Sequence, residues 1–295
     1  MYCIMNSELI YILWNPDLII CHIGPLAIRW YSTCWLLGLL GCYLLVKYLY
    51  RKQGLADEKF EPLFLYCFVG ILIGARLGHC LFYEPAYFLS SWQHMVEMVL
   101  PIRQGIDGSW HFTGYEGLAS HGGTIGIILA LLLYSRNLKV GMWTVLDIVS
   151  ISVPICASFI RLGNLMNSEI IGKPTDVPWA FIFERVDNLP RHPGQLYEAI
   201  AYACFFVVLW TIYRKTNVTS PNGKQQRNPL IGTGFYFGLD ILLIFLFRFF
   251  IEYTKEVQEA FEASMPIDMG QLLSIPFILL GAYYTWHGLK KAKQA

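Results

Sequence analysis

Long apolar stretches separated by short polar segments dominate the hydropathy pattern of the chain. About 20 apolar residues are needed to cross the hydrocarbon core of a bilayer, and seven stretches reach or approach that length. We predict spans at residues 26–48, 62–83, 121–135, 142–164, 196–213, 231–251 and 269–288. The pattern therefore predicts an all-α polytopic membrane protein with about seven transmembrane helices, in which residues 1–295 form a single integral membrane domain.

The composition supports a membrane protein and excludes several other classes. Hydrophobic residues make up 55% of the chain and charged residues 15%, whereas soluble domains carry about 25% charged residues. The net charge of +1 provides no field that would attract nucleic acid. The eight cysteines show no C-x-x-C spacing, and most lie in predicted spans, where cysteine behaves as a small hydrophobic residue.

The distribution of basic residues predicts the orientation of the chain. Lysines and arginines cluster after the first, third, fifth and seventh spans, in segments 47–59, 136–139, 214–227 and 290–293. The positive-inside rule places such segments in the cytoplasm. We therefore expect the N-terminus outside and the C-terminus inside, with residues 84–120 and 165–195 as periplasmic loops and residues 1–25 as a short exoplasmic segment.

Polar and ionisable residues gather at the outer ends of the predicted spans. They are Arg76, His79, His121, Arg161, Asn164, Glu169, Arg191, His192, Arg248 and Glu252. An arginine inside a span costs roughly 2.5–3.5 kcal/mol on insertion scales, so it usually has a partner or a function. Guanidinium groups bind phosphate oxygens bidentately, and histidine exchanges protons near neutral pH. The set indicates a site that binds a phospholipid head group and activates a nucleophile.

Structural explanations compete with this interpretation at several positions. A terminal arginine such as Arg161 can snorkel to the interface, and Arg248 with Glu252 at i, i+4 can neutralise each other. Glycines repeat every fourth residue from Gly70 to Gly78, which is typical of close helix packing.

Other function classes are also open on the residues alone. Asp147 and Asp240 are charges in the cytoplasmic halves of their spans, which keeps a membrane transporter or lipid flippase as the alternative function. A non-catalytic scaffold leaves the arginines and histidines without a role. A lipid hydrolase of known type is disfavoured, because the sequence has no Gly-x-Ser-x-Gly elbow and no His-Glu-x-x-His motif.

Five sequence strings identify a family. They are Ala119-Ser-His121-Gly-Gly, Arg161-Leu-Gly-Asn164-x-x-Asn167-x-Glu169-x-x-Gly172, Arg191-His-Pro-x-Gln195-Leu-Tyr197-Glu198, Arg248-x-x-x-Glu252 and Met269-Gly-Gln-x-Leu-Ser-x-Pro276. In this order, over residues 31–276, they resemble the motifs of bacterial prolipoprotein diacylglyceryl transferases. The Arg161 string resembles the signature of that family and is the most specific of the five.

The resemblance implies a seven-span enzyme of the bacterial inner membrane with its active site toward the periplasm. Such an enzyme transfers the sn-1,2-diacylglyceryl group of phosphatidylglycerol to the lipobox cysteine thiol of a prolipoprotein, which is the first step of lipoprotein maturation. The products are a thioether and glycerol 1-phosphate. The implied partners are phosphatidylglycerol, prolipoprotein signal peptides with a lipobox cysteine, and membrane lipids. No metal or organic cofactor is implied, and no nucleic acid.

The resemblance also implies site residues. Arg161 and Arg248 match arginines suited to the phosphate, and His121 matches the proposed proton acceptor, although a group near it remains an alternative base. Further phosphatidylglycerol-binding candidates are Tyr31, Asn164, Glu169, Gly172 and Glu252, with Arg76 added from its position on the second span. The chain departs from the family pattern at Ile244, where relatives can carry tyrosine, at Gly194 for serine, and at Arg29 for histidine.

Overall fold

The computed structural model of the chain describes residues 3–6, 9–24, 26–100, 102–105, 108–112, 117–219, 226–255 and 267–294. The chain divides into two compact units. One contains residues 1–54 and 146–295, and the other contains residues 55–145. That both belong to a single membrane domain stays a prediction.

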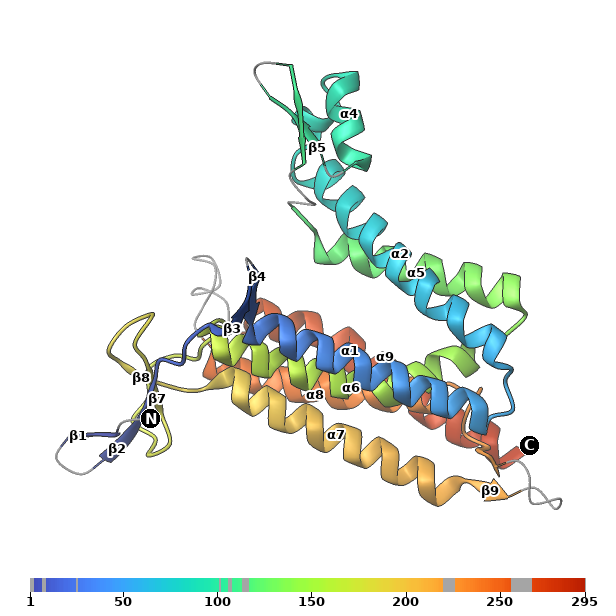
Figure 1. Cartoon of the computed structure of the whole chain (residues 1–295). Coiled ribbons are helices and arrows are strands. Elements are labelled where there is room, and N and C mark those ends of the chain that lie inside the picture. The colour runs from blue at the N-terminus through green and yellow to red at the C-terminus, as the bar shows by residue number, and fades with distance from the viewer. Residues whose placement is uncertain are drawn as a thin grey trace. The chain divides into compact units, whose positions relative to one another are not determined.

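The larger unit is a bundle of long helices. Figure 1 shows α1 (Trp30–Lys52), α6 (Met142–Asn167), α7 (Gly194–Thr216), α8 (Phe235–Ile251) and α9 (Met269–Gln294) side by side. Small residues allow close contacts between them. A Cβ added at Gly281 of α9 would lie 2.6 Å from the backbone nitrogen of Leu242 in α8, and one at Gly38 of α1 would lie 3.2 Å from the Cα of Cys156 in α6.

A small sheet covers one end of this bundle. Its strand order is β1 (Cys3–Asn6), β2 (Leu9–Trp14), β7 (Phe181–Phe183) and β8 (Pro190–Arg191). Strand β2 pairs parallel to β7, and the Trp14 indole N–H donates to the Leu165 carbonyl near the end of α6 at 2.8 Å. Leu165, Phe181 and Phe183 form a buried cluster with Trp14 and Leu196 against it. The sheet therefore fixes segment 168–193, which leads into the candidate site.

Three two-stranded ladders complete the described strands. The ladder of β3 (Ile19–Ile23) and β4 (Leu26–Arg29) precedes α1, and that of β9 (Val218–Thr219) and β10 (Gln226–Arg227) follows α7. The third, β5 (Ile102–Gln104) with β6 (Trp110–Phe112), belongs to the smaller unit. The prediction of an all-α protein with loop elements did not include any of these strands.

The smaller unit is built on the antiparallel pair α2 (Asp57–Phe82) and α5 (Ser120–Leu138). Its glycines pack the two backbones together, because a Cβ at Gly78 would lie 2.6 Å from the Cα of Gly122 and one at Gly70 would lie 2.8 Å from the carbonyl oxygen of Gly126. This confirms the packing interpretation of the glycine repeat. Beyond α2 come α3 (Pro85–Phe88), α4 (Trp92–Val99) and the β5–β6 hairpin.

Each of the seven predicted spans overlaps a helix, although the first four residues of span 26–48 form strand β4, so α1 begins only at Trp30. Five of these helices, α1, α2, α6, α7 and α9, are long and apolar enough to cross a membrane, so the chain is a mostly helical polytopic membrane protein. The total of seven spans and the orientation stay predictions. Helix α8 begins four residues later than predicted, because residues 231–234 form a turn in which Gly234 adopts φ +89°.

Candidate active site

An ion pair between two long helices forms the centre of the site. Arg161 lies six residues before the end of α6, and Glu198 lies in the second turn of α7. The Nε atom of Arg161 is 2.8 Å from Oε2 of Glu198, and their side chains are 20% and 1% exposed. Arg161 thus presents one edge of its guanidinium group to a buried carboxylate and remains partly open on the other.

A second cation approaches the same carboxylate from the segment after α8. The Nζ of Lys255 lies 3.0 Å from Oε1 of Glu198 and 3.6 Å from Oε2 of Glu252, which belongs to the 3-10 turn η1 (Glu252–Thr254). Glu198 therefore bridges Arg161 and Lys255, one on each oxygen. A buried charge is tolerated when it is paired in this way.

The end of α6 supports Arg161 through a chain of polar contacts. Nη1 of Arg161 donates to Oδ1 of Asn164 at 3.5 Å, and Nδ2 of Asn164 donates to Oε2 of Glu169 at 3.0 Å. Nδ2 of Asn167 holds the other oxygen of Glu169, also at 3.0 Å. The Asn164 and Asn167 amides thus clamp the Glu169 carboxylate over the end of the helix.

The backbone around Glu169 is strained. Ser168 and Ile170 both adopt left-handed conformations, with φ of 57° and 56°. This region is a genuine outlier for a β-branched residue such as Ile170. Strain of this kind persists only where the surrounding structure enforces it, and it concentrates at functional sites.

Gly172 joins the strained turn to the rest of the site. Its N–H donates to the His192 carbonyl at 2.9 Å, and the next N–H, of Lys173, donates to the Thr254 carbonyl at 2.9 Å. A Cβ at Gly172 would lie 2.7 Å from both carbonyl oxygens, so only glycine permits this close approach. The second contact holds the backbone beside Lys255.

Arg191 has a structural role in the same segment. Its guanidinium Nε lies 3.1 and 3.0 Å from the two oxygens of Asp187, and its Nη1 donates to the Gly172 carbonyl at 3.2 Å. The hydrogen bonds from Arg191 hold the pKa of Asp187 below its ordinary value of 3.8.

His192 lies partly buried beside this segment. Its Nδ1 lies 3.2 Å from the Tyr197 hydroxyl, which also accepts a hydrogen bond from the Trp179 indole at 2.8 Å. Burial, with a smaller contribution from the nearby Lys173 cation, lowers the pKa of His192 below 6.5.

Arg248 lies exposed on α8. Within the described part of the chain it makes no hydrogen bond or ion pair, and Glu252 is engaged by Lys255 instead, so the self-neutralising pair considered from the sequence does not form. The phenol of Tyr202 in α7 interacts electrostatically with both Arg161 and Arg248. Tyr31 reaches the same helix end from α1, since a Cβ at Gly163 would lie 3.0 Å from its ring.

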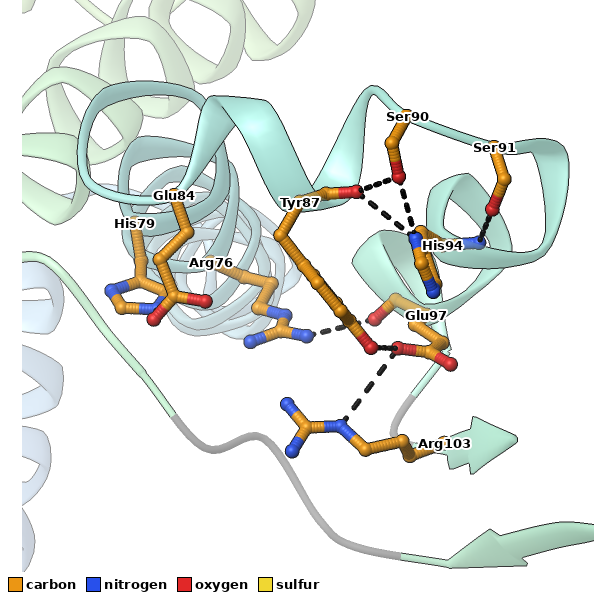
Figure 2. Close-up of polar contacts among 9 residues, drawn as sticks. All are labelled: Arg76, His79, Glu84, Tyr87, Ser90, Ser91, His94, Glu97 and Arg103. Carbon is orange, nitrogen blue, oxygen red and sulfur yellow. Dashed lines mark hydrogen bonds and ion pairs between the residues drawn. The ribbon is translucent and has the colours of Figure 1, made fainter. Parts of the chain in front are cut away.

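The two other predicted site residues, His121 and Arg76, belong to the smaller unit. His121 lies in the first turn of α5, exposed, and has no hydrogen bond or ion pair among the described residues. Arg76 is buried on α2, where its Nη2 donates to the Glu97 carbonyl at 2.8 Å (Figure 2) and its guanidinium lies 5.0 Å from the centre of the Phe88 ring.

The structure thus brings together most of the predicted site residues of the larger unit and adds three that the sequence did not single out. Glu198 was quoted in a motif without a role, although an acidic residue inside an apolar helix is a functional candidate by default. Lys255 follows Glu252 at i+3, a spacing that suggests a pair. Tyr202 gave no signal among the many aromatic residues.

Asp147, one of two residues behind the transporter alternative, has a structural partner. Its Oδ2 accepts from the N–H groups of Gly232, Thr233 and Gly234 at 2.9, 3.1 and 2.9 Å, and its Oδ1 accepts from that of Phe237 at 3.1 Å. A carboxylate in this position caps the N-terminus of α8. Asp240 is also buried, and its Oδ1 has no hydrogen bond within the described residues.

In the described ranges, His, Cys, Asp and Glu nowhere form a group of three or more able to hold a metal ion.

Comparison with known proteins places the chain in a family. The family model described as "Prolipoprotein diacylglyceryl transferase" matches residues 18–287. The chain belongs to this family. The phosphatidylglycerol–prolipoprotein diacylglyceryl transferase of Bacteroides fragilis strain ATCC 25285 is 52% identical over 289 residues, which cover 98% of this chain and 99% of the relative. Those of Tolumonas auensis and Porphyromonas gingivalis are 43% and 39% identical, over 91% and 95% of this chain and 94% and 95% of the relatives.

Family membership confirms the resemblance predicted from the five motifs and makes the chain a transferase. The comparison extends over nearly the whole sequence, so the Arg161 network lies within the matched region.

Proposed function

We propose that the Arg161 network is the site at which this transferase binds the head group of phosphatidylglycerol. The reaction is the transfer of the diacylglyceryl group from phosphatidylglycerol to a prolipoprotein, as the names of the relatives state. In chemical terms, the lipobox cysteine sulfur bonds to the terminal glyceryl carbon while the bond from that carbon to the phosphate oxygen breaks. The phosphate keeps the electron pair and leaves as glycerol 1-phosphate, and the thiol proton passes to a base.

The proposal rests on one observation, the fixed orientation of the Arg161 guanidinium group. Glu198 occupies its Nε and Asn164 accepts weakly from Nη1, so the orientation of the guanidinium is set before a ligand arrives. A partly open, oriented guanidinium is suited to a phosphate, which it binds through two parallel hydrogen bonds. Such preorganised donors stabilise the charge that develops on a leaving group.

Arg248 supplies further positive charge for the phosphate in this proposal. It is exposed and has no carboxylate partner in the described residues, while Glu198 is shared between two other cations. The remaining candidates of the larger unit surround the same helix end. They are Tyr31, Asn164, Glu169, Gly172 and Glu252, which we assign to binding the head group or to holding the groups that bind it.

His121 is our candidate for the base that accepts the thiol proton, with a group near it as the alternative. Its imidazole is exposed and has no described protein partner, and thiolate rather than thiol is the attacking species. Arg76 is bound to the Glu97 carbonyl and packed on Phe88, which favours a positioning role over direct contact with the head group. We place the site on the periplasmic side of the inner membrane, because the basic clusters follow the opposite ends of the spans.

The activity assay uses purified protein, phosphatidylglycerol and a lipobox peptide with either cysteine or serine at the acceptor position. We expect mass spectrometry to detect a peptide heavier by one diacylglyceryl group, and released glycerol phosphate, with the cysteine peptide only. Absence of both products with several phospholipids would contradict the proposed reaction.

The site assignment is tested by Arg161→Lys, which keeps the positive charge but loses the planar guanidinium group that can bind phosphate through two hydrogen bonds. We expect activity to fall about tenfold or more, the value of roughly one charge-assisted hydrogen bond. Arg214→Lys is the matched control, because Arg214 is exposed near the other end of α7 and should tolerate the change. Normal turnover by Arg161→Lys at an unchanged membrane level would show that Arg161 does not bind the phosphate.

A further inference from the structure

The short helix α4 exposes an apolar face and buries the carboxylate-bearing residue Glu97. Trp92, Met95 and Val99 follow each other at i, i+3 and i+7, a spacing that places them on one side of a helix. They are 72%, 45% and 65% exposed. Glu97, on the opposite side, and Met98, at the edge of the apolar face, are buried. This is the reverse of the arrangement expected for a helix on a water-covered surface.

The polar contacts on the buried side fix the orientation of α4 (Figure 2). The Glu97 carboxylate accepts a hydrogen bond from the Tyr87 hydroxyl at 2.9 Å and pairs with Nε of Arg103 at 3.8 Å, while the Glu97 carbonyl accepts from Arg76. At the other end, the Ser91 hydroxyl caps the helix by accepting from the N–H of His94. Rotation of α4 to bury its apolar face would break these contacts.

Two contacts locate α4 relative to the end of α2. Arg76, which holds the Glu97 carbonyl, lies six residues before the last residue of α2, and that corresponds to about 9 Å along a helix axis. Met98 packs in a buried cluster with Cys80, two residues before that end. The C-terminal end of α4 therefore lies beside the final turns of a helix that is long and apolar enough to cross a membrane.

We propose that α4 is an interfacial anchor whose exposed face, Trp92, Met95 and Val99, inserts into the lipid at this end of α2. The partner is the phospholipid bilayer itself. The apolar face continues the exposed apolar surface of α2, where Leu81 and Phe82 are 42% and 74% exposed. Tryptophan is favoured at the boundary between head groups and acyl chains, and a short helix with opposed apolar and polar faces lies in that plane.

This inference does not depend on the chemistry proposed for Arg161. Its consequence is that α4, whose eight residues are too few to span the membrane, is held at the depth of the lipid boundary. The hairpin that follows supports the same assignment, because Phe112 at the end of β6 is 80% exposed.

The test places the photoreactive residue p-benzoylphenylalanine at 92, 95 or 99 of the full chain in phosphatidylethanolamine–phosphatidylglycerol vesicles. Gln93 is the matched control position, since it is exposed on the same helix but lies off the apolar face. We expect lipid adducts at the three face positions to exceed those at position 93 several-fold, with transferase activity retained. Equal yields at position 93, or adducts to protein in place of lipid, would overturn the proposal.

A fluorescence measurement covers the case in which a photoreactive variant does not fold. The difference in emission between the unaltered protein and Trp92→Phe isolates the Trp92 signal. We expect phospholipid brominated near its head group to quench this signal and aqueous iodide to leave it largely unchanged. Strong quenching by iodide would place Trp92 in water and refute the anchor.

Discussion

The Nε atom of Arg161 lies 2.8 Å from Oε2 of Glu198, and the other oxygen of the same carboxylate lies 3.0 Å from Lys255. The helix α7 thereby supplies one anion to two cations from different segments. Because Glu198 is 1% exposed, removing its charge would leave Arg161 without the buried anion that it pairs with. The orientation of Arg161 depends mainly on this carboxylate, with a weaker contact from its Nη1 to Asn164.

We predict that Glu198→Gln impairs both stability and transfer. Loss of one partner from a buried ion pair costs about 3–5 kcal/mol, and we expect the lower part of this range because Arg161 is 20% exposed. Denaturant titration measures the stability and the lipobox peptide assay measures the transfer. Glu58→Gln is the control, as Glu58 is exposed in the first turn of α2. Equal effects of the two substitutions would contradict a central role for Glu198.

We predict different effects on stability when alanine replaces Gly172 and when it replaces Gly194. A Cβ at Gly172 would lie 2.7 Å from the carbonyl oxygens of His192 and Thr254, whereas one at Gly194 would have no neighbour closer than 3.8 Å. We expect Gly172→Ala to lower the free energy of unfolding by about 1–3 kcal/mol and Gly194→Ala to leave it unchanged or slightly raised. Thermal unfolding compares them, and a neutral Gly172→Ala would show that the loop can move aside. The room at Gly194 would also accommodate a serine.

We predict that relief of the strain at Ile170 slows the transfer reaction without lowering the stability of the protein. Glycine adopts the left-handed conformation without the cost of roughly 1–2 kcal/mol that a side chain incurs. We therefore expect Ile170→Gly to unfold no more easily than the unaltered protein, yet to transfer more slowly because the clamp on Glu169 loosens. Unfolding and initial rates are measured on the same preparation. Unchanged activity in a stabilised variant would mean that the strain has no function.

The two buried aspartates should differ when each is changed to asparagine. Asp147 accepts four backbone N–H groups at the start of α8, and hydrogen bonds to a charged group contribute about 1.5–3 kcal/mol each. We expect Asp147→Asn to destabilise the protein by about that amount. Asp240→Asn should cost little, since Oδ1 of Asp240 has no hydrogen bond in the described residues. Similar losses for both variants would contradict the assignment of Asp147 as a cap.

We predict that His192 lowers the free energy of unfolding in mild acid. Burial lowers its pKa below 6.5 in the folded protein, so the unfolded chain takes up the proton first as the pH falls. The contribution of the neutral imidazole is complete above about pH 6.5 and is lost as the pH falls through the folded pKa. We expect the stability difference between the unaltered protein and His192→Gln to shrink between about pH 8 and pH 5. A pH-independent difference would exclude His192 as the source.

The long helices were predictable because a bilayer imposes one simple requirement on the sequence. An apolar stretch of sufficient length satisfies its own backbone hydrogen bonds as a helix, so every predicted span overlaps one. Boundaries were less accurate where polar chemistry decides them. The start of α8 is set by Asp147, which lies far away in sequence and on another helix.

The site was predictable only as a set of residue types at the ends of spans. Hydropathy and motifs identified Arg161, Asn164 and Glu169, which the structure joins by hydrogen bonds. They could not show that Glu198 rather than Glu252 pairs with Arg161, because that choice depends on how α6 and α7 pack. The pairing of β2 with β7 could not be predicted either. The two strands are distant in sequence, and the residue pattern of one does not identify the other as its partner.

The parallel pairing of β2 with β7 has a consequence for biosynthesis. Asn15, just after β2, bonds to Glu184, and the two are 169 positions apart. At roughly 5–20 residues per second, a ribosome needs on the order of ten seconds or more to make the intervening chain. During that interval the ribosome makes α1, α2 and α6, which are long and apolar enough to cross a membrane, while the edge of β2 that later pairs with β7 stays unpaired. Nascent chains arrested before residue 181 should therefore carry a protease-sensitive amino terminus that becomes protected once β7 has emerged.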